Sequence, residues 1–245
     1  MKKKKKDKIF AKKMKIQDFN FDNKVANVFD EMLERSVPFY AETQRMIGKL
    51  VEKFAQDGTN IYDLGCSTGT TMLNIAPRIK TKDIKIIGID NSIPMLERAK
   101  EKLKKKGVRD RCELKCADLN QPLFLNNPSV VILVLTLQFI RPIQREALIK
   151  QIYDQLIANG CIIAVEKILA NDSMTNRLFI DLYYDYKKSR GYSQLEIAQK
   201  REALENILIP YRIDENIMLL RRSGFPIVDT FFQWHNFAGF LGIKQ

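Results

Sequence analysis

The residues best suited to chemistry stand in one acid- and glycine-containing stretch, Asp63-Leu64-Gly65-Cys66-Ser67-Thr68-Gly69. The apolar residues Ile61 and Tyr62 precede it, and a helical pattern over residues 70–79 follows it. Glycine is favoured where a backbone turns sharply or approaches a ligand, because it has no Cβ. The start of the following helix offers unpaired N–H groups and the positive end of a dipole. This strand–turn–helix unit predicts a site for the polar part of a nucleotide-like ligand.

The glycine spacing distinguishes this turn from other nucleotide-binding loops. The order Gly65-x-Ser67-x-Gly69 differs from the G-x-G-x-x-G of dinucleotide-binding proteins, and the sequence contains no G-x-x-x-x-G-K-[ST] of a phosphate-binding loop. An acid before such a turn resembles the first motif of class I S-adenosylmethionine (SAM) enzymes. A tight turn that merely requires small residues is the alternative.

A second acid ends the next predicted strand. Asp90 follows an apolar run at residues 86–89 and lies 21 positions after Gly69, about the distance at which βαβ folds place a ribose-binding acid. An aspartate can accept hydrogen bonds from both ribose hydroxyls. The alternative is that Asp90 caps the next helix, although Ser92 suits that role and leaves Asp90 free.

A third acid, Asp118, follows the strand-like run at residues 112–116. Its carboxylate could accept a hydrogen bond from an adenine amino group, while the N–H of the next residue meets a ring nitrogen. An aspartate after a strand is also ordinary turn chemistry. Three strand-end signals in order indicate a ligand site more strongly than any one of them does.

An alternation of strands and helices positions these acids. We expect strands at residues 61–64, 84–89, 112–115, 130–135 and 160–166, and helices at residues 70–79, 93–106 and 142–157. This pattern predicts a doubly wound, mostly parallel α/β sheet. Residues 227–234 and 237–243 read as an antiparallel hairpin that completes seven strands, as in a class I SAM-methyltransferase-like fold.

The predicted SAM-binding domain, residues 19–245, also contains helical segments outside the alternation of strands and helices. Helices at residues 23–35 and 40–54 precede the first strand and are placed to cover the ligand. Residues 171–210 form a helical insertion, in which an aromatic-rich stripe at residues 178–186 predicts a lid or a homodimer contact.

The net charge of +12 is concentrated at the start of the chain. Residues 1–15 hold nine lysines and one aspartate, so the remaining chain carries only +4. We expect residues 1–18 to form a disordered basic tail; weak contact with nucleic acid is one role for it, and a merely solvated tail is the more common one. The charge therefore does not predict an RNA-binding domain.

The composition and the absence of several motifs exclude some classes of function. Four scattered cysteines suggest a reduced cytoplasmic protein, and no metal-ligand set accompanies them. No apolar run approaches the ~20 residues of a membrane span, so no membrane association is expected. His235 is the only histidine and lies far from the strand ends, which disfavours a histidine base. Neither a G-x-S-x-G elbow nor the Pro-Pro-aromatic loop of many amino-methylating enzymes is present.

Five stretches resemble the carboxy-S-adenosyl-L-methionine synthase family over about residues 19–237. They are Arg35-Ser36-Val37-Pro38-x-Tyr40, Tyr62-Asp63-Leu64-Gly65-Cys66-Ser67, Ile89-Asp90-Asn91-Ser92, Thr136-Leu137-Gln138-Phe139 and Gly191-Tyr192-Ser193-x-Leu195-Glu196-Ile197-x-Gln199-Lys200-Arg201. The first and last are far more specific than general SAM motifs.

The resemblance implies a carboxyl-transferring transferase of class EC 2.1.3, not a methyl-transferring enzyme. Members convert SAM and prephenate to carboxy-SAM and phenylpyruvate. A separate enzyme uses the product to modify the wobble uridine of tRNA to its 5-oxyacetyl form, so this chain needs no direct tRNA contact. Prephenate loses carbon dioxide and hydroxide as it aromatises, and no protein base is required.

The resemblance also implies site residues. Tyr40 and Arg201 would hold the new carboxylate, with Arg201 in cis or from a partner subunit. The other matches are Gly65, Cys66 and Ser67 for the methionine part, Asp90 and Asn91 for the ribose, and Asp118 and Leu119 for the adenine. Two positions depart from the family: Val134 replaces an asparagine and Phe39 a glycine.

Two other functions are compatible with the sequence. One is a SAM-dependent methyltransferase with an unknown acceptor, which would form S-adenosylhomocysteine. The other is a catalytically inactive SAM-fold protein that binds RNA through its lysine tail.

Overall fold

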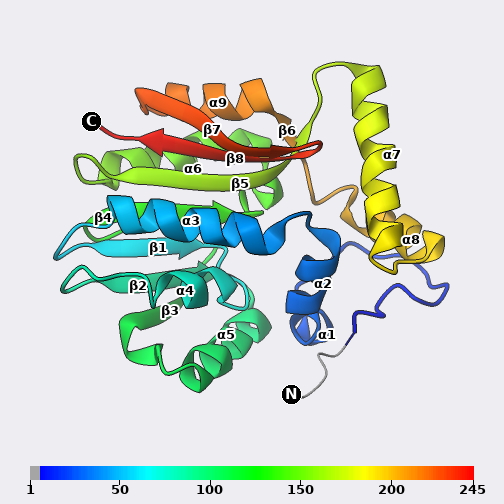
Figure 1. Ribbon diagram of the computed structural model, residues 1–245, viewed down its shortest axis with the longest axis horizontal. Helices are drawn as coiled ribbons and strands as arrows, with labels where there is room; N and C mark the ends of the chain where they lie inside the picture. Colours follow the sequence, from blue (N-terminus) through cyan, green and yellow to red (C-terminus); the bar gives the residue numbers. More distant parts are fainter. Residues whose placement is uncertain (1–5) are drawn as a thin grey trace.

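The computed structural model describes residues 6–245, so the first five residues of the predicted tail lie outside the described part. The sheet there runs in the order β3-β2-β1-β4-β5-β8-β7, and the short β6 pairs with β5 (Figure 1). The strands are β1 Asn60–Leu64, β2 Lys85–Asp90, β3 Cys112–Cys116, β4 Pro128–Val134, β5 Cys161–Leu169, β6 Tyr211–Arg212, β7 Ile227–Trp234 and β8 Phe237–Ile243. Only the β8 pairings, with β5 and β7, are antiparallel. The prediction of a doubly wound, mostly parallel sheet is confirmed.

Helices cover both faces of this sheet. They are α1 Asn23–Ala26, α2 Phe29–Ser36, α3 Tyr40–Phe54, α4 Thr70–Ile75, α5 Ile93–Lys105, α6 Pro142–Gln155, α7 Ser173–Ser189, α8 Gln194–Leu204 and α9 Ile213–Arg222. Successive strand residues alternate between two cores, as the pleat requires. In β1, Ile61 packs in the core with α3, α4 and α5, whereas Tyr62 packs in the core with α6 and α9.

One expected helix is divided in two, and another is shorter than the sequence pattern indicates. The prediction of one helix over residues 23–35 is wrong, because Val28 leaves the helical region at φ −121° and ψ 1°. Its N–H bonds to the carbonyl of Val25 three residues back, and the Asn27 side chain competes for the carbonyl of Asn23. Helix α4 ends at Ile75, before Pro77, rather than at residue 79.

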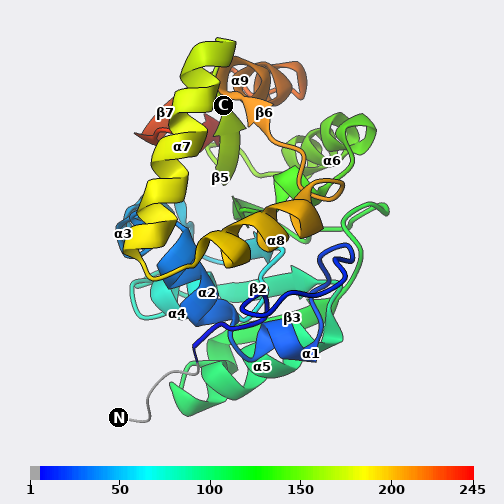
Figure 2. The ribbon, with the colours of Figure 1, turned by 90° about the vertical axis from the view of Figure 1, so that its right-hand side faces the viewer.

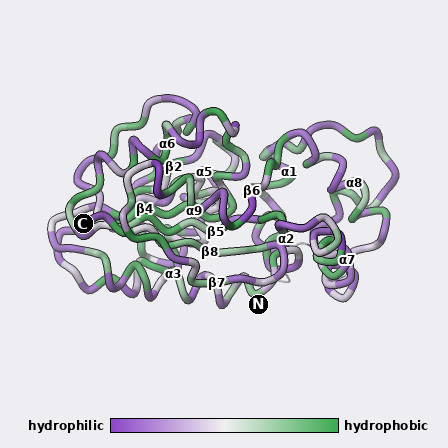
Figure 3. The backbone as a smooth tube through the Cα atoms, turned by 90° about the horizontal axis from the view of Figure 1, so that it is seen from above, coloured by the Kyte–Doolittle hydropathy of each residue, from purple (hydrophilic) through white to green (hydrophobic). Residues whose placement is uncertain are grey.

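The helices α1, α2, α7 and α8 gather at one end of the molecule, opposite the C-terminus (Figure 3). This end is where the parallel strands finish, since β5 leads directly into the α7–α8 pair (Figure 1). The two helices occupy the insertion expected at residues 171–210. They face the turns that follow β1, β2 and β4.

Residues 7–21, which we call the N-terminal strap, run along α8 (Figure 2). The Gln199 side chain accepts a hydrogen bond from the N–H of Met14 (3.0 Å) and donates to the carbonyl of Phe10 (2.9 Å). Asp7 is buried, and its side chain accepts a hydrogen bond from the Tyr192 hydroxyl at 3.1 Å. The strap overlaps the predicted tail, in which Asp7 and Phe10 are buried while most of residues 11–18 are exposed.

Candidate active site

A cavity of about 580 Å³ opens between the carboxyl ends of the parallel strands and the helices α2, α7 and α8. Every site residue expected from the sequence lines it: Tyr40, Gly65, Cys66, Ser67, Asp90, Asn91, Asp118, Leu119 and Arg201. These residues come from positions spread over most of the chain, and the sheet order brings them together.

The turn after β1 forms the floor of the cavity. Its backbone is left-handed at Gly65 (φ 73°), Ser67 (φ 50°) and Gly69 (φ 73°). The N–H groups of Gly65 and Cys66 both donate to the carbonyl of Ile89, at 2.7 and 3.0 Å. A Cβ at Gly65 would collide with the Thr136 side chain from the loop after β4. The glycine therefore allows two strand-end loops to touch beneath the cavity.

Asp90 connects the β1 turn with the start of α5. Its Oδ2 accepts from the N–H of Ser67 and its Oδ1 from the N–H of Ser92, both at 2.9 Å. Burial raises the pKa of Asp90, and these N–H groups oppose that rise. The side chain of Ser92, not that of Asp90, caps α5 through the N–H of Met95.

Asp63, the acid of the glycine motif, lies behind the turn and is only 1% exposed. Burial, with the charge of Asp90, raises its pKa to about 7. Its Oδ2 has no hydrogen-bond partner in the part of the chain that the structure describes. An unpaired buried carboxylate is costly, which favours the protonated form near neutral pH.

Tyr40 is the first residue of α3, and its side chain is buried against the β1 turn and α7. The polar side chains of Thr70 and Gln44 lie near its hydroxyl and favour the ionised form slightly. Burial, with the charges of Asp30 and Asp63, raises the pKa of Tyr40 well above its usual value. The phenol therefore keeps its proton and can donate to an anion.

The residue before Tyr40 has an unusual backbone. Phe39 caps α3 with φ 52° and ψ 27°, in the left-handed region that favours glycine, and its side chain is 58% exposed. Phe39 thus replaces the glycine expected from the family resemblance at a position whose backbone conformation a glycine would adopt without strain.

Arg201 lies on the exposed side of α8 at the cavity rim. The helix starts with a capping box in which Ser193 and Glu196 bond reciprocally. The Arg201 guanidinium donates to the Tyr184 hydroxyl at 3.4 Å. Glu205 acts on the Arg201 charge only through electrostatic attraction, without a hydrogen bond. Arg201 and Tyr40 thus reach the same cavity from α8 and α3.

Asp118 and Leu119 lie after β3 at the other end of the cavity. One Asp118 oxygen accepts from the N–H and the side-chain amide of Asn120, at 2.9 and 2.8 Å. Asp118 therefore has the ordinary turn role through Oδ1, and neither of these two bonds uses its second oxygen. Leu119 is buried beside it.

Glu166 on β5 is a buried carboxyl that the sequence did not mark. It accepts hydrogen bonds from the N–H groups of Thr136, Leu137 and Gln138, at 3.2, 2.9 and 3.0 Å. Burial raises the pKa of Glu166 to about 7, and the three N–H groups oppose this. The carboxyl holds the loop after β4 against the cavity.

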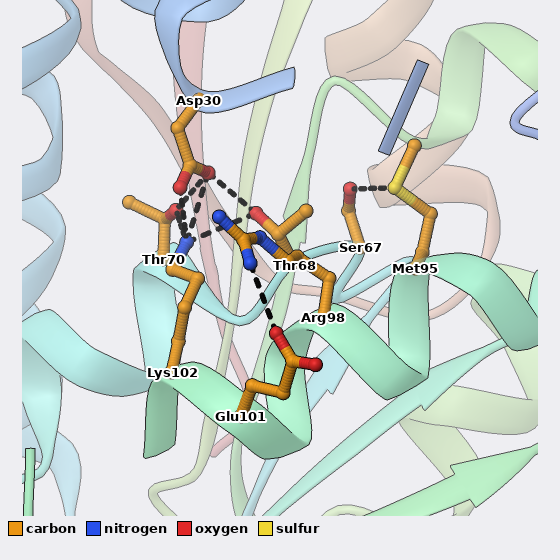
Figure 4. Close-up of polar contacts among 8 residues, drawn as sticks. All are labelled: Asp30, Ser67, Thr68, Thr70, Met95, Arg98, Glu101 and Lys102. Atoms are coloured by element: carbon orange, nitrogen blue, oxygen red, sulfur yellow. Dashed lines mark hydrogen bonds and ion pairs between the residues drawn. The ribbon is translucent and has the colours of Figure 1, made fainter. Parts of the chain in front are cut away.

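A polar cluster attaches the cover helix α2 to the cavity floor (Figure 4). The Asp30 carboxylate accepts from the hydroxyls of Thr68 (2.6 Å) and Thr70 (3.2 Å), and it pairs with the Lys102 ammonium at 2.7 Å. Burial opposes ionisation of Asp30, but Lys102 and the two threonine hydroxyls together outweigh it, so the pKa of Asp30 is lowered. Both threonines line the cavity, so Asp30 fixes α2 relative to the site.

Basic side chains form the opposite wall of the cavity. Lys167 at the end of β5, Lys187 on α7 and Lys200 beside Arg201 on α8 all line it. Lys167 and Lys187 did not appear among the residues expected from the sequence, because a lysine in a helix or strand is usually a solvated surface residue. Lys187 is buried and Lys167 half-buried, and this depends on how β5 and α7 meet.

Comparison with known proteins identifies the family. A methyltransferase domain model matches residues 61–160. A carboxy-S-adenosyl-L-methionine synthase of Methylococcus capsulatus is 48% identical over 229 residues, which cover 94% of this chain and 95% of the relative. The chain belongs to the carboxy-S-adenosyl-L-methionine synthase family. A second carboxy-S-adenosyl-L-methionine synthase, from Desulfotalea psychrophila, is 45% identical over 240 residues and 98% of both chains.

Solved structures support the fold of this carboxy-S-adenosyl-L-methionine synthase family member. An O-methyltransferase family protein of Burkholderia thailandensis matches with a TM-score of 0.64 at 15% identity, covering 91% of this chain and 60% of that protein. Human N-acetylserotonin methyltransferase in complex with SAM matches with a TM-score of 0.59 at 14% identity, covering 91% and 55%. The chain has the SAM-binding methyltransferase fold and is a SAM-using enzyme. No helix within residues 6–245 is long and apolar enough to cross a membrane.

Proposed function

We propose that the protein converts SAM and prephenate to carboxy-SAM and phenylpyruvate. The observation that carries the proposal is that Tyr40 and Arg201 both line the cavity that the SAM-motif residues also line. A protonated phenol and a guanidinium are suited to a carboxylate, because both donate hydrogen bonds and the guanidinium is always charged. The two relatives named carboxy-S-adenosyl-L-methionine synthase support this proposal.

In this proposal SAM lies along the ends of β1, β2 and β3. Gly65, Cys66 and Ser67 contact the methionine part, Asp90 and Asn91 the ribose, and Asp118 with Leu119 the adenine. Parallel sheets of this kind bind ligands at the carboxyl ends of their strands, which supports the placement. Val134, at the end of β4, offers no side-chain hydrogen bond in place of the family asparagine.

The proposed reaction needs no protein base. Prephenate loses its ring carboxylate as carbon dioxide and its hydroxyl as hydroxide while the ring becomes aromatic. The hydroxide removes a proton from the SAM methyl, and the resulting ylide carbon forms a bond to carbon dioxide. Tyr40 and Arg201 then hold the new carboxylate. The only histidine, His235, packs on Trp234 and Phe179 instead of lining this cavity.

The proposed cellular role follows from the product. Carboxy-SAM would supply a separate enzyme that modifies the tRNA wobble uridine, so this cytoplasmic chain would not itself need to hold tRNA. We also propose a homodimer, because Leu178 and Leu182 on α7 remain exposed while Tyr183 and Tyr186 of the same helix pack within the chain. The basic N-terminus would add at most a weak contact with nucleic acid.

The product distinguishes the proposal from a methyltransferase. The protein is incubated with SAM and prephenate, and mass spectrometry is used to detect carboxy-SAM and S-adenosylhomocysteine. We expect carboxy-SAM that depends on prephenate. S-adenosylhomocysteine formed with an added acceptor, without carboxy-SAM, would support the methyltransferase instead.

A substitution tests the site. Arg201→Ala should abolish carboxy-SAM formation and leave SAM binding, measured by calorimetry, within about twofold. Arg177→Ala is the matched control, because Arg177 on α7 is exposed and pairs only with Asp181 at 3.3 Å. An Arg201→Ala protein with the wild-type product yield would refute the role of Arg201.

A further inference from the structure

We infer that Lys167 and Lys187 form a second anion subsite, which holds the 2-oxo acid carboxylate of the co-substrate. This inference rests on the proposed function for the identity of the ligand. It assigns Arg201 and Tyr40 to the carboxylate that is transferred, and the two lysines to the carboxylate that stays with the departing product.

The two lysine side chains converge from different elements. Lys167 leaves the end of β5, and Lys187 leaves the last turn of α7. Their ammonium nitrogens lie 5.5 and 4.5 Å from the centroid of the same Tyr183 ring, and the Lys187 nitrogen also lies 5.0 Å from the Tyr184 ring. Tyr184 in turn contacts Arg201. Three cations thus surround one aromatic wall of the cavity.

Neither amine has a carboxylate partner within residues 6–245. Lys187 is only 6% exposed, and the charges that act on it are those of Lys167, Lys200 and Arg201. Burial, together with these three cations, lowers its pKa to about 7. Burial also lowers the pKa of Lys167. Buried cations are normally paired, so an anionic ligand is the expected missing partner.

The neighbouring basic residue differs in this respect. Burial, with the charge of Arg35, lowers the pKa of Lys200 to about 8, and the acids Asp7, Glu31 and Glu196 oppose this fall. Lys200 thus has acidic neighbours in the N-terminal strap, in α2 and on its own helix. The charges that act on Lys187, in contrast, are all positive.

The position of these lysines favours a co-substrate over SAM itself. The methionine part of SAM is assigned to the β1 turn, whereas Lys167 ends β5, and β4 lies between the two strands. Adjacent strands are about 4.8 Å apart, which puts the lysine backbone roughly 10 Å from the β1 turn. A second molecule beside SAM can span that distance. Prephenate suits the site because it carries two carboxylates, and phenylpyruvate keeps only the 2-oxo acid carboxylate.

Binding of phenylpyruvate tests the subsite separately from catalysis. Phenylpyruvate is titrated by calorimetry into SAM-saturated full-length wild type, Lys187→Met and Lys188→Met. Lys188 is the next residue on α7 but is exposed and pairs with Asp185 at 3.0 Å. We expect Lys187→Met to weaken binding about 10- to 100-fold, as for loss of a charge-assisted hydrogen bond, and Lys188→Met to change it less than twofold.

The outcomes separate the inference from the proposed function. Equal phenylpyruvate affinity in wild type and Lys187→Met would overturn the subsite, as would a wild type that does not bind phenylpyruvate. Weaker SAM binding by Lys187→Met with unchanged phenylpyruvate binding would assign the lysine to SAM and would also overturn it. Failure of wild type to form carboxy-SAM would refute the reaction but leave the binding comparison valid. A higher KM for prephenate in Lys187→Met, with SAM affinity unchanged, would support both.

Discussion

Replacing the buried ammonium of Lys187 should make the ligand-free protein more stable. The unfolded chain binds this proton with a pKa of 10.5, whereas the folded chain binds it with a pKa of about 7. The charged form is thus disfavoured by folding. Lys187→Met keeps an unbranched side chain of similar length and removes the charge, so the folded state no longer includes an unpaired buried cation.

The size of the effect follows from the two pKa values. At about 1.4 kcal/mol for each tenfold change in proton affinity, a fall from 10.5 to about 7 corresponds to an upper limit of roughly 5 kcal/mol. The penalty is absent above pH 10.5, develops as the pH falls, and is complete below about pH 7. At pH 9.5 only about 1.4 kcal/mol remains. Local relaxation and water reduce these limits, so we expect a gain of at least about 1.5 kcal/mol at pH 6.5.

Urea unfolding at pH 6.5 and pH 9.5 measures this gain. Lys187→Met should be stabilised at the lower pH and much less so at the higher pH. Lys188→Met should change the free energy of unfolding by under about 0.5 kcal/mol at both, because its ion pair is exposed. Equal stability of Lys187→Met and wild type at pH 6.5 would show that the amine is solvated or already neutralised, and would refute the reasoning.

Three further substitutions test the cavity floor and its cover. In urea unfolding, Gly65→Ala should lower the free energy of unfolding by about 1–3 kcal/mol more than Gly107→Ala does. Both glycines have positive φ, but only at position 65 would the added Cβ collide with a side chain, that of Thr136. Equal losses for the two variants would contradict this. Asp30→Ala should cost about 1–3 kcal/mol by the same measurement, since it removes the carboxylate that pairs with the partly buried Lys102 ammonium at 2.7 Å and accepts from both threonine hydroxyls; an unchanged free energy of unfolding would show that this cluster does not hold α2. Phe39→Gly should raise the unfolding free energy by up to about 1 kcal/mol, because relief of the left-handed backbone exceeds the added chain entropy; a lower melting temperature would show that the Phe39 side chain contributes packing.

Local sequence patterns predicted the residues at the strand ends. Gly65, Asp90 and Asp118 stand next to apolar runs, and parallel strands place such positions on one edge whatever the rest of the chain does. The family motifs added Tyr40 and Arg201, whose helices carry no local sign of a ligand. The structure brings both to the cavity.

Residues whose environment depends on distant contacts could not be predicted in the same way. Lys187 looks like a surface lysine until Lys167 and the α7 aromatic residues meet around it. Asp7 stands among lysines, so composition suggested a free tail, yet its burial depends on Tyr192. The break at Val28 likewise reflects one turn of competing hydrogen bonds, which helical periodicity does not detect.

The attachment of the N-terminal strap to Gln199 has a practical consequence for handling the enzyme. Gln199 stands two positions before Arg201, so the strap residues Phe10, Lys12 and Met14 brace the helix that presents the guanidinium. A shortened preparation, or one whose affinity tag displaces these residues, would retain an intact sheet and still turn over poorly. Turnover numbers from differently tagged samples would therefore not be comparable until the beginning of the chain is the same in each.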